Sequence, residues 1–379
     1  MSANVLITGG AGFIGSNLCH SLIAKGYKVT VLDCLSSQIH GDDPENNSYL
    51  FLSIKGKVKF IRGCVTSRNT WLEAIEGQDA IIHLAAETGT GQSMYEIQRY
   101  SDVNIGGTAL MLDLLANTKH NVKKVIVASS RSIYGEGKYL SEKYGIVYPE
   151  HRTDFFLEKG DFDVKYNDED KQLQLLATDE GSKIHPSSVY GITKQTQEQM
   201  VMTVCASMGI ASVAYRYQNV YGPGQSLSNP YTGILSIFST LILNNKEINI
   251  FEDGKESRDF VYITDVVDAT IMGLEKNSAD GQVFNVGTGT PTDVLKVATL
   301  LIKNYQSNSN VTITGNYRLG DIRHNYADLT KISNLLGYIP KYDFETGIKL
   351  FTDWVLTQKV QPTKYEHSLQ EMKAKGLFK

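Results

Sequence analysis

Near the N-terminus the chain reads Val5-Leu6-Ile7-Thr8-Gly9-Gly10-Ala11-Gly12-Phe13-Ile14-Gly15. The apolar start predicts a buried strand, and residues 16–25, which follow directly, predict a helix. Glycines at this spacing, Gly9, Gly12 and Gly15, permit a tight turn whose backbone N–H groups can approach a pyrophosphate at the helix N-terminus. The stretch therefore predicts the opening strand, turn and helix of a dinucleotide-binding α/β fold.

Short β-branched runs alternate with helix-length segments through the first half of the chain. The runs are residues 29–32, 58–61, 80–84 and 125–127. Runs of this kind, separated by amphipathic stretches, are typical of parallel strands buried on both faces. We therefore expect an α/β protein with a doubly wound parallel sheet of the Rossmann type.

The domain organisation follows from where this alternation stops. We expect residues 1–221 to form the dinucleotide-binding domain, with a polar surface insertion at about 136–184. After it, Pro186 can start a helix that carries Tyr190 and Lys194, followed by a strand at residues 212–215. Less regular segments from Gly222 onward, among them a strand at 247–251, predict a smaller α/β substrate lobe over 222–379, with some segments returning to the main sheet. From Thr352 the sequence predicts a helix that carries a tryptophan, followed by a charged tail. This last stretch suggests no function.

Composition and charge exclude several function classes. With 41% hydrophobic and 21% charged residues, the chain has the composition of an ordinary globular protein. Its formal net charge of −4, without a long Lys/Arg run, predicts neither nucleic acid nor a membrane as partner. Four cysteines without C-x-x-C spacing predict no metal site. Without a secretory pattern after Met1 or a bilayer-spanning apolar stretch, we expect a cytoplasmic protein.

Asp33 ends the second predicted strand, about 20 residues after the glycine turn. An acidic side chain there can accept hydrogen bonds from the hydroxyls of an adenosine ribose and repels a 2′-phosphate. No Arg or Lys stands between Asp33 and Pro44. The sequence therefore predicts NAD rather than NADP as the cofactor.

Tyr190 and Lys194 are four residues apart and therefore share one face of a helix. A nearby ammonium stabilises a phenolate, which would let Tyr190 act as an acid/base at neutral pH. The buried strand at 125–128 ends in Ser129-Ser130-Arg131-Ser132, at the edge where ligands of such sheets bind. We therefore expect Ser130 to hydrogen-bond the reacting oxygen, with Ser132 as a second contact.

Taken together, these motifs resemble the extended short-chain dehydrogenase/reductases, and among them the nucleotide-sugar epimerases and dehydratases. The resemblance rests on the glycine turn, Asp33, His83-Leu84-Ala85-Ala86, Asn104-Ile105-Gly106-Gly107-Thr108, Ser129-Ser130 before Tyr134-Gly135, and Tyr190 with Lys194. It implies that Ser130, Tyr190 and Lys194 are catalytic. It further implies NAD contacts from Gly9, Gly12, Phe13, Ile14, Gly15, Asp33, Val65, Leu84, Ala85, Ala86, Asn104, Ser129, Tyr190, Lys194 and Tyr217.

The same resemblance implies a nucleotide-diphosphate sugar as substrate. Tyr215-Arg216-Tyr217-Gln218-Asn219-Val220-Tyr221-Gly222-Pro223-Gly224 is similar to the family segment that touches nicotinamide and diphosphate. The segments around Arg258 and Arg318 are similar to those that clamp the diphosphate, and guanidinium forks suit phosphate oxygens. The implied substrate contacts are Ser130, Arg131, Ser132, Asn219, Arg258 and Arg318.

The reaction implied by the resemblance is a 4-epimerisation. The 4,6-dehydratases carry Asp-Glu directly after the catalytic hydroxyl, whereas this chain has Arg131-Ser132 there. Details such as residues 35–41 and 129–137 are similar to 4-epimerases that act on dTDP-L-rhamnose, a dTDP-6-deoxyhexose. Two alternatives stay open: an NAD(P)H-dependent 4-ketoreductase of a nucleotide 4-keto-6-deoxy sugar, and a catalytically silent dinucleotide sensor. The family commonly dimerises through the helix of Tyr190 and the one before it, so a homodimer is expected.

Overall fold

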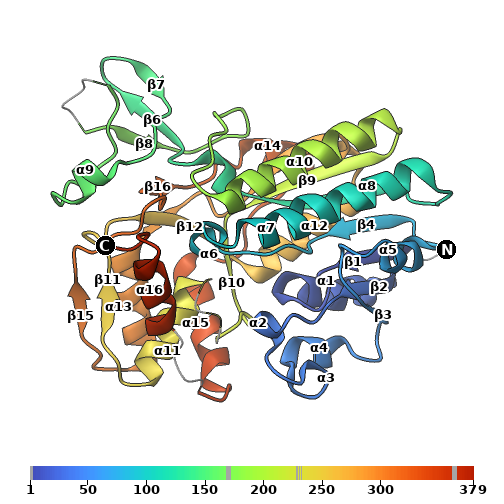
Figure 1. Cartoon of the computed structure of the whole chain (residues 1–379), viewed down its shortest axis with the longest axis horizontal. Coiled ribbons are helices and arrows are strands. Elements are labelled where there is room, and N and C mark those ends of the chain that lie inside the picture. Colours follow the sequence, from blue (N-terminus) through green and yellow to red (C-terminus); the bar gives the residue numbers. More distant parts are fainter. Residues whose placement is uncertain (1–2, 168–171, 228, 230, 232, 361–364) are drawn as a thin grey trace.

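The computed structural model describes residues 3–167, 172–227, 229, 231, 233–360 and 365–379. Its centre is a seven-stranded sheet in the order β13-β9-β5-β4-β1-β2-β3, in which every neighbouring pair is parallel (Figure 1). The strands are β1 (Asn4–Thr8), β2 (Lys28–Asp33), β3 (Lys59–Arg62), β4 (Ala80–His83), β5 (Lys124–Ser130), β9 (Ala211–Tyr217) and β13 (Gln282–Val286). The predicted doubly wound parallel sheet is therefore confirmed.

Helices cover both faces of this sheet, as the alternation of side chains along β1 shows. Val5 and Ile7 face a core built with α1 (Phe13–Ala24) and α12 (Ile263–Glu275), whereas Leu6 faces a second core. The second core includes α5 (Arg68–Ile75), α8 (Gly107–Asn117) and α10 (Val189–Ser207). Both layers exclude water from the strands, which explains their nearly continuous apolar runs.

Two predicted helix starts were wrong by three residues. α1 begins at Phe13 instead of Ser16, because Gly12 already occupies the N-cap position. α10 begins at Val189 instead of Pro186, because the Ser188 side chain accepts a hydrogen bond from the Gly191 backbone N–H and caps the helix there. The remaining helices of the first domain are short: α2 (Ser37–His40), α3 (Pro44–Asn47), α4 (Tyr49–Ile54), α6 (Thr90–Ser93), α7 (Ile97–Tyr100), a π-helix (Ser101–Gly106) and a 3₁₀ turn (Arg131–Tyr134).

The second lobe lies beside the carboxyl edge of the main sheet (Figure 1). It contains β10 (Asn219–Tyr221), β12 (Ser257–Tyr262), β14 (Pro291–Asp293) and β16 (His324–Asn325) in one sheet, and β11 (Ile248–Ile250) with β15 (Val311–Ile313) in another. Its helices are α11 (Ile234–Leu243), α13 (Val294–Tyr305), α15 (Phe344–Leu356) and α16 (Tyr365–Ala374), while α14 (Thr330–Leu336) and a 3₁₀ turn (Asn277–Ala279) flank β13. β13 returns to the main sheet beside β9. No helix in the described part of the chain is long and apolar enough to cross a bilayer.

The insertion at 136–184 is more ordered than its polarity predicted. It forms a three-stranded antiparallel sheet of β6 (Lys138–Ser141), β7 (Gly145–Val147) and β8 (Gln174–Leu176), with the short helix α9 (Asp154–Leu157). Residues 168–171 of the predicted polar stretch lie outside the described residues. The insertion projects from the body (Figure 1), but Glu136 and Arg152 are almost fully buried against the second lobe. The predicted surface insertion is therefore buried at its base.

Candidate active site

The turn after β1 has the geometry of an anion cradle. Gly9 has a φ of +67°, and a Cβ there would lie 2.9 Å from the Ala85 backbone nitrogen. At Gly15 a Cβ would lie 2.4 Å from the Gly9 carbonyl oxygen, so glycine allows the helix to pack against the turn. No side chain in the described part of the chain caps α1, and its first turn holds no acidic residue. Its first N–H groups are therefore available to a phosphate.

Asp33, at the end of β2, is buried beside this turn. Its two carboxylate oxygens accept hydrogen bonds from the backbone N–H groups of Ala11 (3.0 Å) and Leu35 (2.9 Å). Burial raises the pKa of Asp33, while the two backbone hydrogen bonds and His40 lower it. The carboxylate thus fixes the glycine turn and keeps lone pairs for further donors such as ribose hydroxyls.

One elongated cavity joins the glycine turn to the ends of β5 and β9, with a volume of about 480 Å³. Predicted residues from both ends line it. They are Gly9, Gly12, Phe13, Ile14, Gly15, Asp33, Val65, Leu84, Ala85, Ala86, Ser129, Ser130, Arg131, Ser132, Tyr190, Lys194, Tyr217 and Asn219. Since parallel strands end at one edge of a sheet, side chains far apart in the sequence meet there. A dinucleotide fits this lining: an anion cradle at one end, an acid beside it, and hydroxyl groups at the other.

The hydroxyl groups of Tyr190, Ser130 and Ser132 form a chain at the far end of the cavity. Ser132 donates from its backbone N–H and its hydroxyl to the Ser130 oxygen, at 3.2 and 2.9 Å. Burial raises the pKa of Tyr190, whereas a hydrogen bond from Ser130 and the charge of Arg131 lower it. Ser93 accepts the Tyr190 backbone N–H at 3.0 Å and so fixes the first turn of α10. The arrangement can hold a substrate hydroxyl and take its proton.

Lys194 lies one turn after Tyr190 but makes its hydrogen bond elsewhere. Its ammonium donates to the Ala128 carbonyl oxygen at 2.8 Å, and burial lowers its pKa to about 7. The sequence led us to expect Lys194 as the cation that stabilises the Tyr190 phenolate. In this structure the positive charge that lowers the Tyr190 pKa belongs to Arg131.

A buried ion pair between Glu198 and Arg216 packs beside the ends of β5 and β9. Glu198, two turns after Tyr190 on α10, accepts hydrogen bonds from Ser129 (2.6 Å) and from the Arg216 guanidinium (2.5 and 3.0 Å). Arg216 also donates to the Tyr134 hydroxyl at 2.7 Å. The Ser129 hydroxyl is therefore engaged by Glu198, although Ser129 lines the cavity.

Arg131 is a predicted substrate residue whose guanidinium is only partly hydrogen-bonded. Its Nε donates to the Asn219 side-chain oxygen at 2.5 Å, while its buried Nη1 has no hydrogen-bond partner among the described residues. Burial and the neighbouring Arg258 lower the Arg131 pKa to about 9. A cation in this position favours an anionic ligand oxygen.

Three predicted site residues do not line the cavity. The Asn104 side chain accepts the Glu87 backbone N–H at 2.8 Å and donates to Thr193 at 2.9 Å, so it braces the cavity wall. Arg258 donates to the backbone oxygens of Ser257, Ile322 and Arg323. Arg318 lies 3.7 Å from the Asp321 carboxylate. The ligand contacts of these three residues stay predictions.

Other cavity residues were missed from the sequence. Gln218 stands between two predicted residues, and neither end of its buried amide has a partner among the described residues. Its place in the segment 215–224 is the signal that could have identified it. Residues after Ala86 also line the wall without a distinctive pattern: Glu87, Thr88, Gly89 and Thr90.

Comparison with known proteins gives consistent matches. Residues 5–154 and 166–287 match the model of the NAD dependent epimerase/dehydratase family. The chain is 35% identical over 353 residues to a dTDP-L-rhamnose 4-epimerase of Burkholderia thailandensis, covering 93% of this chain and 94% of that protein. The crystal structure of a UDP-glucose 4-epimerase of Thermotoga maritima superposes with a TM-score of 0.73 at 29% identity, over 93% and 98% of the two chains. The crystal structure of a UDP-glucuronic acid 4-epimerase of Bacillus cereus, in complex with UDP-glucuronic acid and NAD, superposes with a TM-score of 0.74 at 25% identity. The match covers 93% of this chain and 99% of that chain.

Proposed function

The chain belongs to the NAD dependent epimerase/dehydratase family, and on that premise we propose that it is an NAD-dependent nucleotide-sugar 4-epimerase. The observation that carries the proposal is the single cavity that joins the glycine turn to Ser130 and Tyr190. A cofactor bound at the turn and a sugar held by the hydroxyl chain would share this cavity, as transfer between them requires.

The residues of this chain divide the chemistry among them. The glycine turn and Asp33 would hold NAD, which would supply reversible hydride transfer at C4 of the sugar. Tyr190 takes the proton of the C4 hydroxyl on its phenolate oxygen and later gives it back. Ser130, which accepts two hydrogen bonds from Ser132, can direct its own hydroxyl toward the reacting oxygen. Arg131 favours the phenolate form of Tyr190.

The positions after Ser130 support epimerisation over dehydration. A 4,6-dehydration must expel water from the sugar, which requires a proton donor beside the reacting hydroxyl. Arg131 and Ser132 stand there, and neither is an acid that can exchange a proton at neutral pH. We further propose dTDP-L-rhamnose as the sugar nucleotide, supported by the 35% identity to an enzyme named for that substrate.

Turnover without added reduced cofactor tests the proposal. The purified protein would be incubated with dTDP-L-rhamnose, and with UDP-, GDP- and CDP-sugars, and the C4 epimers measured by NMR. We expect an equilibrium mixture of C4 epimers from one of these substrates, because an epimerase recycles its hydride. No conversion of these sugars, together with stoichiometric NADH oxidation when NADH and a nucleotide 4-keto-6-deoxy sugar are supplied, would identify a ketoreductase. NAD binding without conversion of any sugar would identify a silent sensor.

The Tyr190→Phe variant tests the assigned acid/base. We expect it to bind NAD normally and to lose turnover by at least ~100-fold, since it lacks the proton acceptor. Tyr49→Phe is the matched control, because Tyr49 lies outside the cavity with 57% of its surface exposed. Near-normal turnover in Tyr190→Phe would refute the assignment.

We also propose that the protein is a cytoplasmic homodimer. The argument for the dimer is that α8 and α10 lie side by side at one surface (Figure 1), where Ile192 of α10 is 49% exposed. Apolar side chains on two adjacent helices can form a four-helix interface with a second copy. Light scattering of the purified protein would give the oligomeric state directly.

A further inference from the structure

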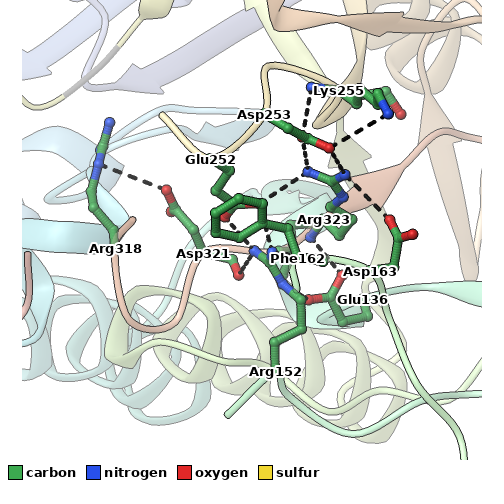
Figure 2. Close-up of polar contacts among 12 residues, drawn as sticks. Glu136, Arg152, Phe162, Asp163, Glu252, Asp253, Lys255, Arg318, Asp321 and Arg323 are labelled. Carbon is green, nitrogen blue, oxygen red and sulfur yellow. Dashed lines mark hydrogen bonds and ion pairs between the residues drawn. The ribbon is translucent and has the colours of Figure 1, made fainter. Parts of the chain in front are cut away.

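A buried cluster of ion pairs joins the insertion to the second lobe (Figure 2). Its members come from segments far apart in the sequence: Glu136 and Arg152 from the insertion, Glu252 and Asp253 after β11, and Arg323 before β16. We refer to these five residues as the inter-lobe cluster. The side chains of Glu136, Arg152, Glu252 and Arg323 are at most 4% exposed. Charges at this depth require close partners.

Arg152 is the centre of the cluster, and each of its five N–H donors has an acceptor. Nε donates to Glu136 (3.2 Å), and Nη1 donates to the Phe162 carbonyl (3.1 Å) and to Glu252 (2.6 Å). Nη2 donates to the second Glu252 oxygen (2.8 Å) and to the Asp321 carbonyl (2.9 Å). Burial disfavours the charged form of Arg152, but these acceptors raise its pKa above the usual value. The geometry is therefore specific for a guanidinium.

The cluster also fixes the backbone of residues 321–323. Arg152 bonds the Asp321 carbonyl, and Glu136 accepts the Arg323 backbone N–H at 2.6 Å. Both bonds come from the insertion side. The position of this segment in the second lobe is thus set by two buried charged groups of the insertion.

The same segment holds the two arginines predicted to bind the diphosphate. Arg258 donates to the carbonyl oxygens of Ile322 (2.6 Å) and Arg323 (2.9 Å). Arg318 lies 3.7 Å from the Asp321 carboxylate, and Figure 2 shows Asp321 between Arg318 and Arg152. A shift of residues 321–323 would therefore move both guanidinium groups.

The other end of the segment is held by the C-terminus. The Tyr317 backbone N–H donates to the Lys379 carbonyl at 2.9 Å, and Leu319 donates to Leu377 at 3.0 Å. The backbone around Arg318 is therefore fixed on one side by the chain end and on the other by Arg152. On the Arg152 side the backbone is held by charged side chains, so a single substitution there can free residues 321–323.

We propose that Arg152 is a positioning residue for nucleotide-sugar binding, which acts by holding residues 321–323 and, through them, Arg258 and Arg318, the two arginines predicted to bind the substrate diphosphate. This inference rests on the proposed function. Removal of the guanidinium leaves Glu136 and Glu252 buried without their main cation, and two buried carboxylates repel each other. The segment then moves, and the diphosphate site loses its geometry.

The test compares Arg152→Gln and Arg152→Lys with the wild-type protein. We expect Arg152→Gln to raise KM for the nucleotide sugar roughly 10-fold, with kcat and NAD affinity nearly unchanged. Lysine keeps the charge but offers fewer donors, so Arg152→Lys should restore part of the affinity. Arg68→Gln is the matched control, since Arg68 forms a half-exposed ion pair with Asp113 away from the cavity.

A double-mutant cycle separates positioning from a merely structural role. The affinity for dTDP is measured by calorimetry for Arg152→Gln, Arg318→Gln and the double variant. If Arg152 acts through Arg318, the double variant should bind dTDP much more tightly than the product of the single effects predicts. Additive effects, or a lower melting temperature with unchanged KM, would overturn the proposal.

Three further outcomes distinguish misfolding of the variant, failure of the proposed function and failure of the inference on Arg152. If Arg152→Gln does not fold, Glu136→Gln takes its place, because it replaces the anionic acceptor of the Arg323 N–H by a neutral amide and leaves Arg152 in place. The same rise in KM is expected for this variant. An unchanged KM overturns the proposal. If the wild-type protein neither binds dTDP nor converts any sugar nucleotide, the proposed function fails. If the wild type does both and Arg152→Gln keeps its KM, only the inference on Arg152 fails.

Discussion

Replacing Glu198 by alanine is expected to lower the stability of the protein by about 3–5 kcal/mol, because the change leaves a buried arginine without its counterion. Arg216 is 4% exposed, and two of its three guanidinium nitrogens donate to Glu198, at 2.5 and 3.0 Å. The Tyr134 hydroxyl and the Glu180 carbonyl, which remain, are neutral acceptors. They cannot replace a carboxylate.

The expected change in melting temperature follows from the length of the chain. Unfolding entropy of roughly 2.1 cal/mol/K per residue gives about 0.8 kcal/mol/K for 379 residues. A loss of about 3–5 kcal/mol then corresponds to a decrease of about 4–6 °C, measurable by calorimetry with saturating NAD. Since Ser129 loses its acceptor as well, turnover should fall together with stability.

A surface ion pair provides the control for this prediction. The Lys349 ammonium lies 2.7 Å from the Asp353 carboxylate, and the two side chains are 62% and 53% exposed. Surface pairs of this kind contribute about 0–1 kcal/mol to stability. Asp353→Ala should therefore shift the melting temperature by about 1 °C or less. Equal shifts in Glu198→Ala and Asp353→Ala would show that burial of the Arg216 pair does not decide its contribution, and the reasoning would be wrong.

Two other substitutions test the two ends of the cavity. Gly15→Ala should weaken NAD binding by about 10- to 100-fold, because its Cβ would lie 2.4 Å from the Gly9 carbonyl, a backbone atom that cannot rotate away; calorimetry showing wild-type affinity would contradict this. Arg131→Gln should move the acidic limb of the kcat/KM profile to higher pH, because the Arg131 charge lowers the Tyr190 pKa and its removal raises the pH at which the phenolate forms. A limb that stays in place or moves to lower pH would contradict the role of Arg131.

The sequence predicted the sheet well because its strands are buried on both faces. The run at 125–127 is apolar throughout and the run at 29–32 is apolar except for Thr30, and each is found within a strand of the structure. Boundaries set by a single hydrogen bond were less predictable: Pro186 suggested a helix start that the Ser188 cap places at Val189. The strand expected at 247–251 is shorter, at Ile248–Ile250.

The cavity was predictable where its residues follow strands of one parallel sheet, and less so elsewhere. Ser130 is the last residue of β5 and Asn219 lies two residues after the end of β9, so their place at the sheet edge follows from topology. Arg258 and Arg318 belong to the second lobe, whose docking no local pattern encodes. Arg152 had no signal at all, because its partner Glu252 is 100 residues away and the polar stretch around it suggested solvent exposure.

The two buried arginine systems have a common consequence for how the active site is held. A buried ion pair contributes little net stability compared with an apolar replacement of the same shape, yet removing one partner is costly. Such pairs therefore act mainly on geometry. The pair of Glu198 and Arg216 fixes the position of α10 against β5 and β9. The pair of Arg152 and Glu252 fixes the insertion against the second lobe. Because the first pair lies behind the catalytic hydroxyls and the second beside the arginines expected to hold the diphosphate, loss of the first should lower kcat and loss of the second should raise KM.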